Sequence, residues 1–169
     1  DIIKHVISLN TYDSIFLKGI SLGGNILLKY LGDGSVVPSQ VKAAMAVSVP
    51  CDLSGSAKAL HTLKNLPYHI NFKWGLVSRL KLKQKQFPDA ITKAKIRTIK
   101  TLNDFDEVYT SRAHGFKNAQ DYYEKCSSLQ FLNAIKTPVL ILNALNDSFL
   151  SEACYPFKEA EMNPNIFLE

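Results

Sequence analysis

The serine at position 21 stands in a pattern that could supply a nucleophile. Gly19-Ile20-Ser21-Leu22-Gly23 matches the GxSxG sequence of a nucleophile elbow, with an apolar run before it and helical spacing after it. A serine at such a sharp strand-to-helix turn exposes its hydroxyl, and the two glycines leave room for the turn to close. The N–H of Leu22, at the start of the helix, could bind a developing oxyanion. The pattern predicts acyl chemistry at Ser21; the alternative is a glycine-rich turn with an exposed serine.

Asp147 is the candidate for the acid that would orient a catalytic base. It follows the most hydrophobic run of the chain, residues 138–144. In hydrolases with a GxSxG elbow, the chain order is serine, then acid, then histidine, and the carboxylate orients the imidazole. The alternative is that Asp147 caps a helix that begins near Phe149.

The four histidines do not fit this order. His5, His61, His69 and His114 all precede Asp147, whereas the motif requires a histidine after the acid. His61 is expected to be an ordinary residue of a helix, and His114, beside a loop glycine, is a weak candidate to reach the site. We therefore expect that this chain contains no triad histidine and that the base follows Glu169.

The cysteines predict neither a metal site nor a disulfide framework. Cys51, Cys126 and Cys154 are an odd, widely spaced set without a CxxC pattern or a Cys/His cluster. We expect no metal and no cofactor, and a reducing, cytoplasmic location. No apolar run is long enough to span a bilayer.

Apolar runs separated by helical patterns predict an α/β fold with a mostly parallel sheet. Four strands are expected at 14–19, 41–49, 138–144 and 165–169, and helices at 1–9 and 22–31. The segment between the second and third strands is far longer than a usual connection, and its pattern predicts helices at 53–63, 72–85 and 90–102. We expect a helical cap insertion over 52–133, between core segments 1–51 and 134–169.

The positive charge is concentrated in that cap. The chain of 169 residues has a net charge of +5, and residues 70–101 carry nine cations and one anion, so the rest of the chain is near −3. No nucleic-acid reading motif accompanies this charge, and we expect no nucleic-acid partner. The segment is either a solvated helix face or a basic, partly apolar surface for peripheral contact with an anionic membrane.

The chain resembles the YheT-like branch of the α/β-hydrolase superfamily, which includes bacterial hydrolases, plant embryogenesis-associated proteins and yeast ethyl-ester synthases. The resemblance covers essentially the whole chain. Its motifs are Gly19-Ile20-Ser21-Leu22-Gly23-Gly24-Asn25, Ala46-Val47-Ser48-Val49-Pro50, Gly115-Phe116, Asp121-Tyr122-Tyr123 and Asn143-Ala144 with Asp147-Ser148-Phe149-Leu150.

The resemblance implies the α/β-hydrolase fold and a serine hydrolase, with Ser21 as nucleophile and Asp147 as triad acid. Where the family usually reads Asp-Asp-Pro-Phe, this chain reads Asn146-Asp147-Ser148-Phe149. The family's early strands, with the second oxyanion N–H, would precede Asp1, and its Gly-Gly-His segment would follow Glu169. The chain is therefore expected to be an inactive C-terminal piece of such an enzyme.

The expected reaction is hydrolysis of carboxylic esters through an acyl-enzyme, on short-chain, medium-chain or lipid-like substrates. An alcohol O-acyltransferase would use the same site. A non-catalytic binding protein that keeps the fold is the alternative from another class.

Overall fold

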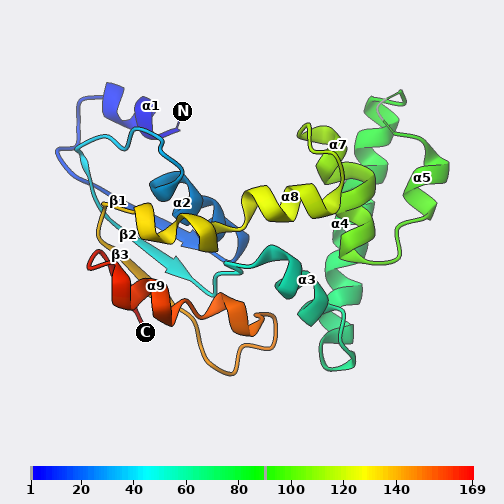
Figure 1. The fold of residues 1–169 in the computed structure, drawn as a ribbon. Coiled ribbons are helices and arrows are strands. Elements are labelled where there is room, and N and C mark those ends of the chain that lie inside the picture. The colour runs from blue at the N-terminus through cyan, green and yellow to red at the C-terminus, as the bar shows by residue number, and fades with distance from the viewer. Residues whose placement is uncertain (1, 90) are drawn as a thin grey trace. The chain divides into compact units, whose positions relative to one another are not determined.

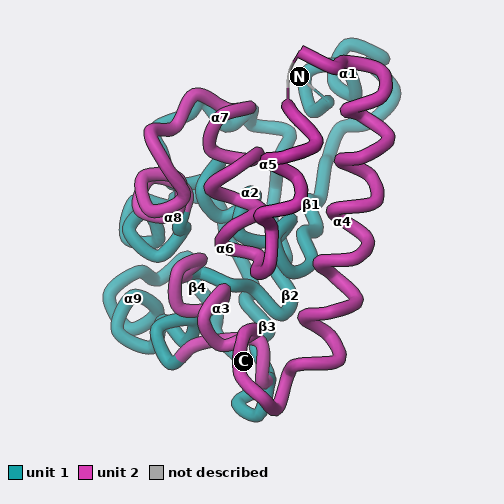
Figure 2. Tube along the Cα trace, turned by 90° about the vertical axis from the view of Figure 1, so that its right-hand side faces the viewer, with its two compact units in different colours: residues 1–51, 127–147, 152–169 teal, residues 52–126, 148–151 magenta. Residues whose placement is uncertain are grey.

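The computed structural model describes residues 2–89 and 91–169 (Figure 1). The chain forms two compact units, which Figure 2 distinguishes by colour. The first unit contains residues 1–51, 127–147 and 152–169, and the second contains 52–126 and 148–151. The chain thus leaves the first unit where the cap was predicted to begin. It returns at Ser127, earlier than the predicted end of the cap at residue 133.

The first unit is built on a parallel sheet of four strands, as the sequence predicts. The strands are β1 (Ile15–Ile20), β2 (Val41–Val47), β3 (Val139–Leu142) and β4 (Ile166–Leu168), and they lie side by side in chain order. All three pairings are parallel. β2 ends two residues before the predicted end because Ser48 adopts a left-handed φ of 50°, which leaves the extended conformation.

One face of this sheet is covered. The helix α2 (Leu22–Gly32), the 3-10 helix η3 (Ser128–Ala134) and the helix α9 (Phe157–Met162) contribute side chains to one core cluster on that face. The cluster also contains buried strand residues, among them Ala46, Val139, Ile141 and Ile166. The short helix α1 (Ile2–Ser8) contributes no buried residue.

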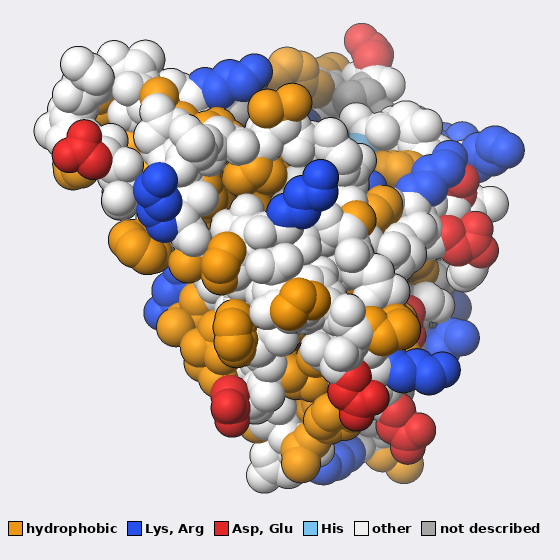
Figure 3. Space-filling view, turned by 60° about the vertical axis from the view of Figure 1, so that its left-hand side comes forward, with side chains coloured by type: hydrophobic (Ala, Val, Ile, Leu, Met, Phe, Trp, Pro, Cys, Tyr) orange, Lys and Arg blue, Asp and Glu red, His pale blue; other side chains and the backbone are white. Residues whose placement is uncertain are grey.

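The opposite face carries large exposed hydrophobic side chains, although strands of a parallel sheet are usually buried on both faces. Phe16, Ile20 and Phe167 are 72%, 61% and 56% exposed. Figure 3 shows one face of the molecule, on which hydrophobic side chains, coloured orange, are exposed at several places. Among the described strands, β1 pairs only with β2, so its outer edge presents unpaired backbone groups beside these side chains.

The second unit is helical in the part of the chain that the structure describes. Two small clusters hold it together, one around Leu80, Ile91, Ile96 and Ile99 and one around Leu53, Ala119 and Tyr123. Its elements are α3 (Leu53–Leu60), η1 (Leu63–Asn65), α4 (Leu66–Gln86), α5 (Lys93–Arg97), α6 (Leu102–Phe105), the π-helical η2 (Asp106–Thr110), α7 (Ser111–Ala113) and α8 (Ala119–Cys126).

Helix boundaries in this unit differ from the predicted ones for identifiable reasons. α4 begins before residue 72 because Pro67, which would break a helix interior, lies in its first turn, where it needs no hydrogen bond. The single helix expected over 90–102 is two helices, since Thr92 and Thr101 each cap a new one with the side-chain oxygen. Ala90, where that helix was expected to begin, lies outside the described residues.

None of the described helices combines the length and apolar character that a bilayer crossing requires.

The open strand edge and the apolar face predict self-association of the chain. Replacing Phe16 and Phe167 together by lysine should shift the chain toward monomer in sedimentation velocity, because both charges lie on the exposed face. Val36→Lys is the matched control, since Val36 is 90% exposed but lies outside the sheet. A monodisperse monomer before any substitution would contradict this prediction.

Candidate active site

The backbone of Ser21 is held in a strained turn between β1 and α2. Its φ and ψ are 52° and −125°, a conformation that costs a non-glycine residue about 1–3 kcal/mol. Backbone hydrogen bonds fix both sides of the turn: the Ser21 N–H donates to the Val47 carbonyl over 2.8 Å, and the Gly24 N–H donates to the Ser21 carbonyl over 2.9 Å. The side chain is exposed and makes no capping hydrogen bond to α2. The hydroxyl is therefore presented to solvent.

Two glycines allow this turn to close, and only one of them is the expected one. A Cβ on Gly19 would lie 2.5 Å from the Gly23 carbonyl oxygen, and a Cβ on Gly24 would lie 2.6 Å from a methyl of Val49. A Cβ on Gly23 would meet no atom within 4 Å. The steric role predicted for Gly23 is therefore wrong. Gly24 has it, because that residue faces the sheet while Gly23 faces solvent.

This difference between glycines can be measured. Gly19→Ala should lower the free energy of unfolding by about 1–3 kcal/mol, because the new methyl overlaps backbone atoms that cannot move aside. Gly23→Ala should leave stability unchanged or raise it by up to about 1 kcal/mol, since alanine is the better helix former. Urea unfolding followed by circular dichroism provides both values. Equal destabilisation by the two substitutions would show that the close contact at Gly19 is not what shapes the turn.

The strand register brings the ends of β1, β2 and β3 to one edge of the sheet. Ile20 is paired with Val47, and Val47 with Leu142, so Ser21, Ser48 and Asn143 follow one another along that edge. Neighbouring strands lie about 4.8 Å apart, which puts Ser21 roughly 10 Å from the end of β3. β4 ends at the same edge, since the Asn143 N–H donates to the Glu169 carbonyl over 3.0 Å.

Asp147 lies on the turn that follows β3. Its N–H donates to the Ala144 carbonyl over 2.9 Å, and the Tyr155 hydroxyl donates to the same carbonyl over 2.8 Å. Partial burial, and next the negative charge of Asp147, raise the pKa of Tyr155. No helix begins at Phe149 among the described residues, and the next element is the 3-10 helix η4 (Glu152–Cys154). The helix-capping alternative for Asp147 is therefore wrong.

Leu22 occupies the first position of α2. The first N–H groups of a helix have no carbonyl partner within it, and they carry the positive end of the helix dipole. The Leu22 N–H thus lies next to the exposed Ser21, and its role as an oxyanion donor stays a prediction.

Asn143 holds together the segments around the candidate site, a role that the sequence analysis did not assign to it. It is buried, and its side-chain oxygen accepts from the Val49 N–H over 2.7 Å, while its side-chain nitrogen donates to the carbonyls of Val49 and Cys154. These bonds fix the segment after β2 and the segment that leads to Tyr155 against the end of β3. The sequence feature that points to this role is an asparagine directly after a buried strand, because a buried polar side chain there needs hydrogen-bond partners within the protein.

Cys51 and the histidines belong to other segments of the chain than the elbow and the turn at Asp147. Burial raises the pKa of the Cys51 thiol to about 12, so this cysteine is not ionised at neutral pH. His5, the histidine of the first unit, lies in α1, which leads into the amino-terminal end of β1 (Figure 1). In the second unit, the ring of His61 contacts that of buried His69 at 4.8 Å, and His114 is exposed after α7.

Comparison with known proteins finds relatives whose sequences match most of the chain. Over 169 residues that make up 99% of this chain, it is 31% identical to the mouse phospholipase ABHD3. Over 145 residues, 84% of this chain, it is 32% identical to YheT of Escherichia coli, which is named as a candidate esterase. These matches cover 41% and 42% of the two relatives, so the chain spans about two fifths of their length. No protein-family model matches the chain.

The chain is homologous to YheT-like α/β-hydrolases. The resemblance that the motifs indicated is thereby confirmed. The fold is confirmed separately by an esterase structure from Pyrococcus furiosus, which superposes with a TM-score of 0.51 at 14% identity. That superposition covers 99% of this chain and 50% of the esterase. In this YheT-like chain the elbow, the turn at Asp147 and the end of β4 all belong to the first unit.

Proposed function

We propose that the protein hydrolyses carboxylic esters through an acyl-enzyme formed on Ser21. The strained, solvent-exposed conformation of Ser21 between Gly19 and Gly24 supports this proposal most strongly. A left-handed φ is strained for serine, and Ser21 differs from Ser48, which has a similar φ, by its exposed side chain in the tight turn between Gly19 and Gly24. Asp147, on the same edge of the sheet, supplies the candidate acid.

In the proposed mechanism, a histidine orients toward Asp147 and accepts the proton of the Ser21 hydroxyl while its oxygen attacks the ester carbonyl. The oxyanion is stabilised by the Leu22 N–H and a second donor. The histidine then protonates the leaving alcohol. Water, deprotonated by the same histidine, attacks the acyl-enzyme, and the histidine returns this proton to the Ser21 oxygen as the acid leaves. We place this histidine beyond Glu169, because β4 ends beside Asn143 at the edge that carries Ser21.

The proposed substrates are short-chain, medium-chain or lipid-like esters. The names of the relatives, a phospholipase and a candidate esterase, support ester substrates of a lipid kind. An alcohol in place of water would accept the acyl group at the same site, which makes alcohol O-acyl transfer the second candidate reaction. A binding protein without turnover is the remaining alternative, and the ester assay below separates it from both.

Peripheral contact with an anionic membrane is also part of the proposal. Residues 70–101 combine nine cations with exposed aromatic side chains such as Phe72 and Trp74. Such a surface attracts anionic headgroups and places apolar groups at their level. The three free cysteines support the proposed cytoplasmic location of the chain.

Substitutions at Ser21 and Asp147 test the acyl chemistry in a protein that contains this chain together with the proposed histidine. Ser21→Ala should reduce hydrolysis of a p-nitrophenyl ester on the order of 10⁴-fold or more and abolish labelling by a fluorophosphonate. Asp147→Asn should reduce the rate roughly 10⁴-fold with labelling slowed in parallel.

Ser48→Ala is the matched control, because Ser48 also follows a strand at this edge and also has a left-handed φ, of 50°. It should keep the rate of the unmodified protein. The 169-residue chain alone, in which no histidine follows Asp147, should be close to inactive. Full turnover by Ser21→Ala, or turnover by the isolated chain that equals that of the longer protein, would contradict the proposal.

A further inference from the structure

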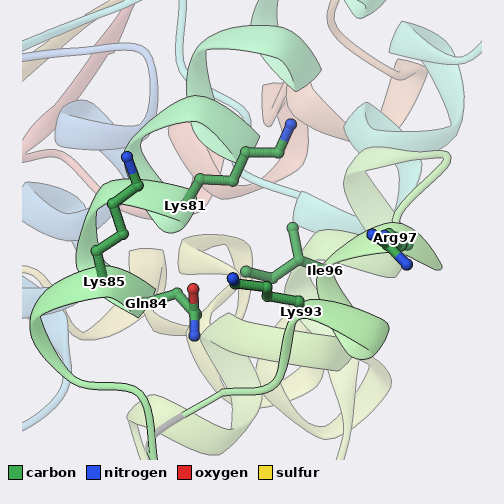
Figure 4. A pocket seen from close by; sticks show the side chains of 6 residues that line it. All are labelled: Lys81, Gln84, Lys85, Lys93, Ile96 and Arg97. Carbon is green, nitrogen blue, oxygen red and sulfur yellow. The ribbon is translucent and has the colours of Figure 1, made fainter.

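A basic cavity lies between α4 and α5 in the second unit. Its volume is about 300 Å³, and the side chains around it come from the C-terminal half of α4 and from α5 (Figure 4). Four of these side chains are cationic and none is acidic. The lining residues are Lys81, Gln84, Lys85, Lys93, Ile96 and Arg97.

The four cations share this cavity without a neutralising carboxylate. Within the part of the chain that the structure describes, none of Lys81, Lys85, Lys93 and Arg97 forms an ion pair. Lys83, which lies between two of them in the sequence, behaves differently: it donates to the Tyr109 hydroxyl over 2.6 Å and lies over that ring. Like charges around one concave surface create a positive potential that concentrates anions.

The chemistry of the lining favours a phosphate group. Lysine and arginine bind phosphate oxygens through charge-assisted hydrogen bonds, and the side-chain amide of the buried Gln84 adds further donors. The volume is at the lower end of the range for ligand pockets, which suits a compact charged group rather than an acyl chain. Ile96, which is buried, gives the cavity one apolar wall.

The same face of α4 continues as an apolar stripe. Leu66, Ile70 and Trp74 are spaced four residues apart and are 42%, 51% and 69% exposed. At 100° per residue, Lys81 and Lys85 fall on this side of the helix as well. Tryptophan beside lysine is the combination found where a helix lies at the level of lipid headgroups.

We propose that this cavity binds the phosphate of a membrane lipid headgroup while the stripe of Leu66, Ile70 and Trp74 enters the interface. The stripe decides between a lipid and a soluble phosphate compound, because a soluble ligand would not require exposed apolar residues next to its site. The inference deepens the membrane contact proposed above by naming the site. It is independent of the chemistry at Ser21, so Ser21→Ala should bind membranes like the unmodified chain.

Intrinsic fluorescence tests this directly, because Trp74 is the single tryptophan of the chain. Vesicles of phosphatidylcholine with 30% phosphatidic acid should shift its emission to shorter wavelength and co-sediment the chain at low salt. Vesicles of phosphatidylcholine with 30% of an uncharged diacylglycerol should do neither. Absence of binding to the phosphatidic acid vesicles at low salt would overturn the proposal.

Charge removal locates the site. Replacing the four cavity cations by glutamine should weaken binding to the acidic vesicles on the order of 100-fold or more. A control with the same loss of charge in the same unit should weaken it less than tenfold, and equal loss in both variants would overturn the proposal by showing attraction to net charge alone. The cavity variant is K81Q/K85Q/K93Q/R97Q, and the control is K64Q/R79Q/R112Q/K117Q.

A third variant distinguishes binding to a membrane lipid from binding to a soluble phosphate compound. Trp74→Gln should weaken vesicle co-sedimentation about tenfold and leave binding of inorganic pyrophosphate, measured by calorimetry, unchanged. Circular dichroism checks that each variant keeps its helix content. Pyrophosphate binding without vesicle binding would overturn the lipid assignment in favour of a soluble ligand, and tighter binding to single-stranded RNA than to acidic vesicles would overturn it in favour of a nucleic acid.

Discussion

The close approach of α2 to the sheet is the constraint on which the candidate site depends. Gly19 and Gly24 face each other where the chain turns from β1 into the helix, and neither position has room for a methyl group. The two elements touch there, and the chain turns at Ser21, which has a φ of 52° and an exposed side chain. The strain at this residue is balanced by backbone hydrogen bonds to Val47 and from Gly24, which would be lost if the turn relaxed.

Buried asparagines join the separate segments of the first unit. Asn143 links the end of β3 to Val49 and Cys154, and Asn163 donates to the carbonyls of Leu132 and Ile135. Asn25 of α2 accepts from the N–H of Ser128, close to the point at which the chain returns from the second unit. Each of these side chains satisfies backbone groups from a distant part of the sequence, groups that would otherwise be buried without a partner. The unit can therefore be assembled from three stretches of chain without losing the alignment of its strand ends.

The second unit has a different organisation, in which two small hydrophobic clusters take the place of a single core. Leu80 and Ile96 anchor α4 and α5 from the inside, which leaves the polar and cationic residues between them to face outward around a cavity. Lys83 is removed from this group by its contact with Tyr109. Lys83 lies on another face of α4 than Lys81 and Lys85. The same basic segment therefore contains a lysine that contacts Tyr109 and lysines that line the cavity.

Local sequence determined the elements and the candidate chemistry. Continuous apolar runs fixed four strands, and GxSxG between a strand and a helix fixed the turn at Ser21, since both signals act over a few residues. Three-dimensional contacts decided the rest. Whether Gly23 or Gly24 is sterically required depends on which one faces Val49, and whether Asp147 caps a helix depends on how the chain folds after β3, where its N–H donates to the Ala144 carbonyl in a turn. The pairing of β1 with β2 and of β2 with β3 placed Ser21 and Asp147 on one edge, because parallel strands align residues far apart along the chain.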